Sequence, residues 1–190
     1  MALNSEWHMG LIVVTGIPGV GKTTVMKRAA EGMDIQFVTF GTVMIELAKE
    51  IGWVKDRDEM RKLTLQQQKE LQTKTAEKIG KMKNVIVDTH CTIKTPKGYL
   101  PGMPEWVIKK LNPTVIIVVE ADPEEIFNRR AKDDTRNRDE DSKEKIAEHQ
   151  QMNRAAAMAY AALTGATVKI VINHDNAIDD AVKEAAPVLE

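Results

Sequence analysis

Cysteine is nearly absent from this sequence, because its 190 residues contain only one, Cys91. A lone cysteine excludes an internal disulfide and is typical of proteins kept in a reducing compartment. No apolar run approaches the roughly 18 residues that a membrane-spanning helix needs. The sequence therefore predicts a cytoplasmic protein with no membrane partner.

An excess of charge of one sign is also lacking. The formal net charge is -1, and 27 basic and 28 acidic residues are interspersed through most of the chain. A nucleic-acid-binding surface usually needs a marked excess of Lys and Arg, so no nucleic-acid partner is expected. Residues 1–9 lack the apolar stretch of a signal peptide and are interpreted as a natural extension or an added leader. Residues 10–190 are of a length that suits one domain.

Apolar runs and helix-like segments alternate along this domain. The five apolar runs are residues 11–14, 35–40, 85–87, 115–119 and 168–172. The helix-like segments are residues 23–33, 43–51, 65–82, 104–111, 123 onward, 152–163 and 176–189. Short, continuously apolar strands separated by helices are typical of a parallel sheet covered on both faces, so an α/β fold with five parallel strands is predicted.

The segment 16-GIPGVGKT-23 follows the first apolar run and precedes a helix-like segment. It matches G-x-x-x-x-G-K-[ST] in the context that a nucleotide phosphate-binding loop (P-loop) requires. Glycines let successive backbone N–H groups face one point, and the start of the helix adds further unpaired N–H groups. The residues predicted to bind ATP are Gly16, Ile17, Pro18, Gly19, Val20, Gly21, Lys22, Thr23 and Thr24.

Lys22 is predicted to be catalytic, because its ammonium can reach the β- and γ-phosphates. The Thr23 hydroxyl is expected to bind Mg²⁺ beside them. Asp88 ends the apolar run of 84-NVIVDTH-90, where it can hold Mg²⁺ through water, although an aspartate there is equally often a turn residue. His90 and Cys91 lack the partners of a zinc site and are interpreted as pocket or core residues.

A phosphate loop alone leaves the reaction open, since switch GTPases, motor ATPases and small-molecule kinases share it. The chain has no N-K-x-D run for guanine and no second domain for a motor to drive. Two charged insertions remain, at about residues 41–83 and 132–145. A small kinase would place its acceptor site in one and its lid in the other.

The second insertion is rich in arginine. Arg129, Arg136 and Arg138 are predicted to be catalytic, since guanidinium groups on a closing lid can neutralise charge on a phosphoryl group in transfer. Arg130 and Arg154 belong to the same group. The alternative is a surface loop whose arginines pair with its own acids, namely Asp133, Asp134, Asp139 and Asp141.

The first insertion offers an acceptor site. Gly41 and Thr42 come just after the second apolar run, where backbone and hydroxyl groups can face a ligand. Arg57 and Arg61 would share one face of a helix, which suits the phosphate of a monophosphate acceptor. The alternative is a solvated patch in which Asp56, Asp58 and Glu59 pair with both arginines.

The sequence resembles the adenylate kinases of archaea. The resemblance is carried by GIPGVGKTT, FGTVM, DRDEMRKL, VIVDTH with KTPKGYLPGMP, TRNRD and MNRAAAMAYAALTGATVKI, from about residue 16 to residue 170. It implies the reaction ATP + AMP ⇌ 2 ADP with Mg²⁺. It also implies a three-layer P-loop NTPase fold with short NMP-binding and lid insertions, and often a homotrimer.

The chain departs from common bacterial and eukaryotic relatives at two places. It lacks an arginine just after FGT and lacks the G-[FY]-P-R run after the third strand, which supply ligands of the AMP phosphate in those relatives. Arg57 and Arg61 are the expected substitutes, with Lys94 or residues 96–102 lining the acceptor pocket. No structural zinc is expected. The alternatives are a kinase for CMP, UMP or a small metabolite, and an RNA-associated ATPase switch.

Overall fold

The computed structural model describes residues 9–132 and 142–189. Five parallel strands form the main sheet, in the order β2-β3-β1-β6-β7. Their bounds are β1 Ile12–Thr15, β2 Gln36–Thr39, β3 Val85–Asp88, β6 Val115–Glu120 and β7 Thr167–Ile172. All five predicted strands are confirmed. Strand β1 pairs with β3 on one side and with β6 on the other. The connections after β1 and after β3 therefore run in opposite directions along the sheet, which opens a crevice at the carboxyl ends of the strands.

The helices are α1 Lys22–Ala29, α2 Phe40–Glu50, α3 Leu65–Gly80, α4 Glu105–Leu111, α5 Pro123–Ala131, α6 Lys143–Thr164 and α7 Ile178–Ala185. Two short 3₁₀ helices span Asp58–Lys62 and Ala186–Val188. Helix α6 begins well before the predicted residue 152, at the cap Ser142, whose hydroxyl accepts from the Lys145 backbone N–H. The charged first turns of α6 carry no apolar run, which is why the sequence pattern placed its start too late.

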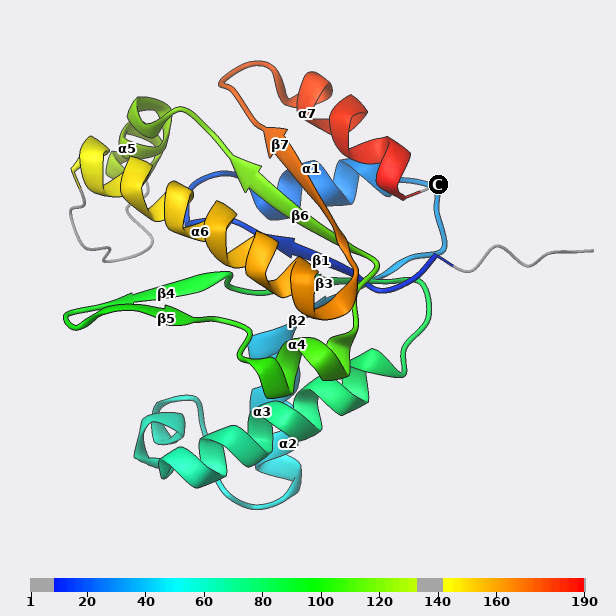
Figure 1. Cartoon of the computed structure of the whole chain (residues 1–190), viewed down its shortest axis with the longest axis vertical. Helices are drawn as coiled ribbons and strands as arrows, with labels where there is room; N and C mark the ends of the chain where they lie inside the picture. Colours follow the sequence, from blue (N-terminus) through cyan, green and yellow to red (C-terminus); the bar gives the residue numbers. More distant parts are fainter. Residues whose placement is uncertain (1–8, 133–141, 190) are drawn as a thin grey trace, which may run out of the picture.

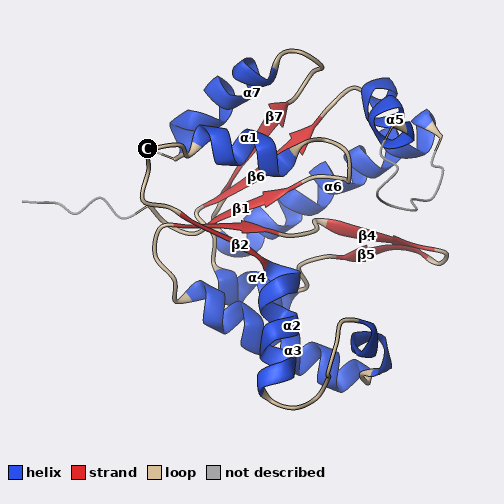
Figure 2. Ribbon diagram, turned by 180° about the vertical axis from the view of Figure 1, so that it is seen from behind, coloured by secondary structure: helices blue, strands red, loops and turns tan. Residues whose placement is uncertain are grey.

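The three inner strands of the sheet, β3, β1 and β6, are buried on both faces, as their unbroken apolar runs predict, whereas the edge strand β2 is mostly exposed. Side chains alternate along each strand: Ile12 and Val14 pack into one core cluster with α1 and α7, and Val13 packs into another. The second cluster also contains side chains from α3, α4 and α6. Figure 2 shows the resulting three layers, with helices on either side of the sheet. The predicted three-layer α/β fold with a five-stranded parallel sheet is confirmed.

One element was not predicted. Strands β4 (Thr92–Thr95) and β5 (Gly98–Pro101) form an antiparallel hairpin, where the sequence suggested only a turn at residues 96–102. The hairpin extends away from the sheet on the side of α5 (Figures 1 and 2). A buried polar cluster anchors it to α6, since the Thr92 hydroxyl donates to Asn153 Oδ1 at 2.6 Å and lies 3.1 Å from His149 Nε2.

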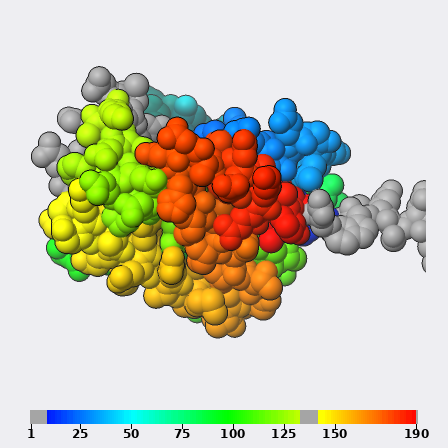
Figure 3. Space-filling view, turned by 90° about the horizontal axis from the view of Figure 1, so that it is seen from above, coloured from blue at the N-terminus to red at the C-terminus, as the bar shows by residue number. Residues whose placement is uncertain are grey.

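Helices α2 and α3, with the segment between them, lie together at the opposite edge of the molecule from α7 (Figure 1). They enclose a small core of their own, made by Ala48, Val54, Leu63 and Leu71. In the space-filling view of Figure 3, α7 and β7 cover the surface between α5 and α1. Within residues 9–132 and 142–189, no helix is both long and apolar enough to span a membrane.

Candidate active site

A cavity of about 720 Å³ lies at the carboxyl ends of the central strands. The phosphate loop and the start of α1 line one side of it, including Lys22, Thr23 and Thr24. The start of α2 and Arg57 line the other side. The end of β3 and the residues that follow it, Asp88, Thr89 and His90, line the cavity between these two sides. The structure therefore brings the predicted phosphate loop and part of the predicted acceptor site to one space.

The backbone of the phosphate loop adopts the conformation that its glycines permit. Gly21 caps α1 with φ 81°, a left-handed conformation that other residues seldom adopt. A Cβ atom there would also come 2.5 Å from Nδ2 of Asn173. Helix α1 therefore begins at Lys22 beside the cavity, and the positive end of a helix dipole suits a phosphate.

Lys22 lies across the base of the loop. Its Nζ donates to the Gly16 carbonyl oxygen at 3.2 Å and lies 3.7 Å from Asp88 Oδ1. Its side chain is only 13% exposed. These two contacts hold the ammonium in the cavity, where a polyphosphate can compete for it.

Residues from the far end of the chain hold the phosphate loop in place. Asn173, which follows β7, donates from Nδ2 to the Val20 carbonyl oxygen at 2.8 Å. Arg130 donates from Nε to the Pro18 carbonyl oxygen at 2.9 Å. Local sequence patterns gave no signal for Asn173, because its partner is 153 positions away.

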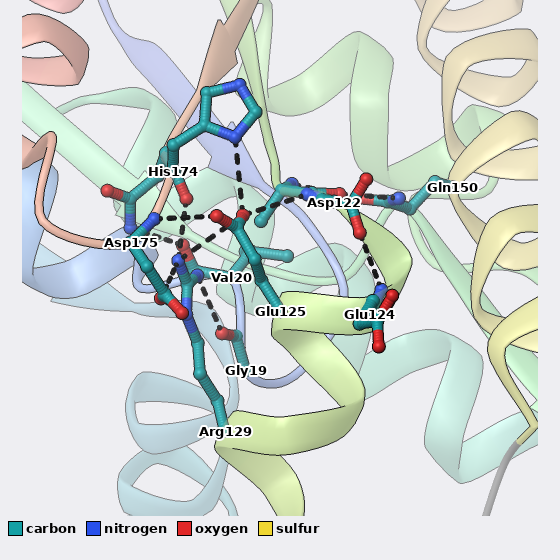
Figure 4. Close-up of polar contacts among 11 residues, drawn as sticks. Gly19, Val20, Asp122, Glu124, Glu125, Arg129, Gln150, His174 and Asp175 are labelled. Atoms are coloured by element: carbon teal, nitrogen blue, oxygen red, sulfur yellow. Dashed lines mark hydrogen bonds and ion pairs between the residues drawn. The ribbon is translucent and has the colours of Figure 1, made fainter.

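Arg129 is part of a dense polar network between α5, the phosphate loop and the segment after β7 (Figure 4). Its guanidinium donates to Asp175 Oδ1 at 2.7 Å, to the Asn173 carbonyl oxygen at 2.8 Å and to the Gly19 carbonyl oxygen at 3.4 Å. The Glu125 carboxylate oxygen Oε2 lies 3.8 Å from Arg129 Nη2. Arg129 lines the cavity, but it does so from a fixed position rather than from a free lid. Arg136 and Arg138 lie outside the described residues.

The oxygen atoms predicted for magnesium lie close to the phosphate side. Thr23 and Asp88 both line the main cavity and also a smaller adjoining hollow at β2. A hydroxyl, one carboxylate and the phosphate oxygens of a nucleotide form the kind of oxygen ligand set that Mg²⁺ takes in such sites. The residues present therefore fit this ion.

His90 also lines the cavity. Its pKa is lowered, mainly by desolvation and next by the positive charge of Lys22, while Asp88 partly opposes the shift. The imidazole is therefore neutral near pH 7, and it adds a hydrogen-bonding group but no charge to the site.

The structure places the predicted acceptor residues in two different hollows. Gly41 and Thr42 lie in the first turn of α2, and both line the main cavity with Arg57. Residues 58–62 form a 3₁₀ helix rather than the expected α-helix, so Arg57 and Arg61 do not share one face. Arg61 lines a separate adjoining hollow and its side chain is 87% exposed.

The hairpin and the residue after it supply one side of the cavity, where the sequence predicted Lys94 or residues 96–102. Ile93 of β4 and Gly102, just after β5, line the cavity, whereas Lys94 is not among the lining residues. Adjacent residues of a strand point to opposite faces, which accounts for the difference. The signal that could have found the hairpin is TPKG between two β-branched or apolar segments, TI and YL.

Two comparisons identify the family. An adenylate kinase of Methanopyrus kandleri is 56% identical over 180 residues, covering 92% of this chain and 94% of the relative. An adenylate kinase of Methanocaldococcus jannaschii is 53% identical over 188 residues, covering 95% and 98%. This chain belongs to the adenylate kinase family. The predicted resemblance is confirmed.

Other comparisons agree with the family's fold. A domain family described as an AAA domain matches residues 15–147 of this adenylate kinase family member. Shikimate kinase of Bacteroides thetaiotaomicron superposes with a TM-score of 0.54 at 17% identity, over 95% of this chain and 98% of that chain. Shikimate kinase of Acinetobacter baumannii gives 0.56 at 16% identity, over 93% and 90%. At such low identity these two structures bear on the fold alone.

Proposed function

We propose that this chain catalyses the reversible transfer of the γ-phosphoryl group of ATP to AMP, giving two ADP. The observation that carries the proposal is the single cavity that the phosphate loop and the start of α2 line from opposite sides. A donor and an acceptor phosphate bound on these two sides face each other. Relatives that are 51–56% identical are adenylate kinases, which favours AMP as the acceptor.

The phosphates of ATP bind along residues 16–24, where Lys22 contacts the β- and γ-phosphates. The AMP phosphate binds at Arg57 and the N–H groups of Gly41 and Thr42, which are charge-assisted donors for an anion. An oxygen of AMP attacks the γ-phosphorus in line, and the bond from that phosphorus to the β-bridging oxygen breaks. The acceptor needs no general base, since a phosphate monoester with a pKa of about 6 is largely ionised near neutral pH.

Thr23 and Asp88 are the residues that would hold Mg²⁺, with Asp88 acting through water. When bound, the ion would neutralise negative charge on the phosphates of ATP. Arg129 holds the phosphate loop in its binding conformation, and Arg136 and Arg138 bring further positive charge to the transferring group. Catalysis is then positioning together with charge neutralisation.

The test is a coupled assay with a panel of acceptors. Fast ADP formation that depends on AMP supports the proposal. ATP hydrolysis that is independent of every monophosphate but increases with RNA would instead support an RNA-associated switch. Transfer to CMP or UMP in preference to AMP would reassign the acceptor.

A homotrimer and a cytoplasmic location also remain predictions. Helix α6 exposes Met158 (60%) and Leu163 (45%), apolar surface that an assembly could bury. Light scattering coupled to size exclusion tests the trimer directly, because a monomeric mass at micromolar concentration contradicts it.

A further inference from the structure

A second hollow, of about 260 Å³, opens beside the acceptor side of the cavity. It is lined by Met44, Met60, Arg61, Gln68, Leu71 and Gln72. Met44 and Gln72 also line the main cavity, so the two spaces adjoin. A mainly apolar slot with a few polar groups suits a flat aromatic ring. A nucleotide whose phosphate lies at Arg57 can therefore place its base here.

The Gln72 amide has a defined orientation. The Trp106 indole N–H donates to Gln72 Oε1 at 3.1 Å. An indole nitrogen can only donate, so the partner must be the amide oxygen and the amide cannot be flipped. Trp106 is itself covered by the Lys69 ammonium, 4.6 Å from the ring centroid. Gln72 is therefore left to present its NH₂ group to a ligand, as a donor.

The Gln68 amide has the opposite polarity. Its Nε2 donates to the Leu63 carbonyl oxygen at 3.0 Å. A carbonyl can only accept, so this end of the amide must be the NH₂ group, and Gln68 is left to present its oxygen. Within residues 9–132 and 142–189, neither Gln68 Oε1 nor Gln72 Nε2 has another hydrogen-bond partner. Four residues apart on α3, the two side chains share one face.

We propose that Gln68 and Gln72 read the base of the acceptor nucleotide. The Gln68 oxygen accepts from an exocyclic amino group, and the Gln72 NH₂ donates to the neighbouring ring nitrogen. Adenine presents this donor and acceptor pair along one edge, and cytosine has the same pattern on a smaller ring. Guanine and uracil place a keto oxygen where the amino group would be, so two acceptors would oppose each other at Gln68. The proposal rests on the phosphotransferase function above and assigns its acceptor to the amino-base monophosphates.

The arrangement makes Trp106 a positioning residue. Its indole N–H selects which end of the Gln72 amide faces the slot, although the tryptophan itself is not a lining residue. A phenylalanine at this position keeps the ring but removes the donor. Gln72 can then rotate and present either end, so discrimination between bases should weaken while the fold is retained.

The decisive comparison uses AMP and inosine monophosphate (IMP). At the base edge that would face Gln68 and Gln72, AMP carries an amino group where IMP carries a keto oxygen. The measured quantity is the AMP/IMP ratio of kcat/KM. The parent protein should favour AMP by roughly 100-fold or more, since unpaired buried polar groups penalise the wrong substrate. Gln72→Glu places an acceptor opposite the ring nitrogen, which suits the N–H of IMP, and should lower the ratio by at least about tenfold. Gln68→Ala and Trp106→Phe should lower it by smaller factors, with the KM for ATP unchanged.

The matched control is Gln66→Glu, which makes the same charge change at an exposed position of α3. The proposal is overturned if Gln72→Glu alters the AMP/IMP ratio no more than this control does, even though AMP is phosphorylated. If the parent transfers phosphate to no monophosphate, the proposed function fails separately. In that case, the affinities of AMP and IMP for the parent and the same variants are measured at equilibrium without ATP. If the parent binds AMP and IMP with equal affinity, the proposal that Gln68 and Gln72 read the base is rejected.

Discussion

Asn173 donates a hydrogen bond of 2.8 Å from its side-chain amide to the carbonyl oxygen of Val20. The donor is buried at the end of the last strand, and the acceptor belongs to the phosphate loop after the first strand. The loop is thus positioned by a residue that is not among those lining the cavity. This relationship links the integrity of the C-terminal strand to nucleotide binding.

Replacing Asn173 with alanine should leave the Val20 carbonyl unpaired and loosen the loop. A lost buried hydrogen bond of this kind costs about 1–3 kcal/mol. We expect a lower midpoint of thermal unfolding and a higher KM for ATP, with the KM for AMP less affected. Steady-state kinetics with each substrate varied in turn measure the difference. Equal changes in both KM values would contradict a role specific to the phosphate loop.

Lys22→Ala should remove most of kcat while leaving the fold intact. The ammonium is held at the phosphate side by Gly16 and Asp88, and no core contact depends on it. Loss of one charge that stabilises the transition state lowers kcat by about 100- to 1000-fold. Circular dichroism and thermal unfolding serve as the folding control. A variant with activity within a factor of a few of the parent would rule out the assigned role.

The structure also separates the expected effects of two arginine substitutions. Arg57 lines the main cavity, whereas Arg61 lines the adjoining hollow and is largely exposed. Arg57→Ala should therefore raise the KM for AMP by about tenfold or more, because it removes a charge-assisted contact with the AMP phosphate. Arg61→Ala should raise it by less. The reverse order in AMP titrations at saturating ATP would move the acceptor phosphate toward Arg61.

The sheet and the phosphate loop could be predicted because their signals are local. The five apolar runs predict the sheet, and the spacing from Gly16 to Lys22 and Thr23 predicts the phosphate loop. The position of Arg129 could not be predicted, because it depends on Asp175 and on backbone carbonyls over 40 residues away. The same holds for Gln72, whose orientation depends on Trp106. Residues that hold a site in place act through tertiary contacts, which leave no periodic pattern in the sequence.

Cys91 should be unreactive in the folded protein. The residue is 1% exposed, and desolvation raises the pKa of its thiol from 9.0 to about 12. A shift of that size lowers the thiolate fraction near neutral pH by about 1000-fold, and only the thiolate is nucleophilic. Alkylation followed by mass spectrometry should therefore label the urea-unfolded chain quickly and the native chain very slowly. Rapid labelling of the native protein would contradict the buried position.

The same shift predicts a change of stability at alkaline pH. Because the folded-state pKa is raised, the stabilisation is fully present below about pH 9 and is lost as pH rises toward about 12. The pKa of Tyr160 is also raised to about 12, so its ionisation further lowers the free energy of unfolding at the alkaline end of this pH range. Cys91→Ala should show a shallower fall of the free energy of unfolding above pH 9, measured by urea denaturation. An identical slope in both proteins would show that the thiol is not the cause.

Glu120 and Arg154 form a two-point ion pair between the end of β6 and α6, in which Arg154 Nε donates to Glu120 Oε1 at 2.7 Å. The Glu120 side chain is only 5% exposed, whereas that of Arg154 is 54% exposed. Arg154→Met should leave a buried carboxylate without its partner and destabilise the fold by about 1–3 kcal/mol, less than for a fully buried pair because Arg154 is partly in water. Glu120→Gln in the Arg154→Met background removes the buried charge and should recover part of this loss. Urea unfolding of the parent, both single variants and the double variant closes the cycle, and no recovery in the double variant would mean that packing of Arg154, rather than its charge, stabilises the contact.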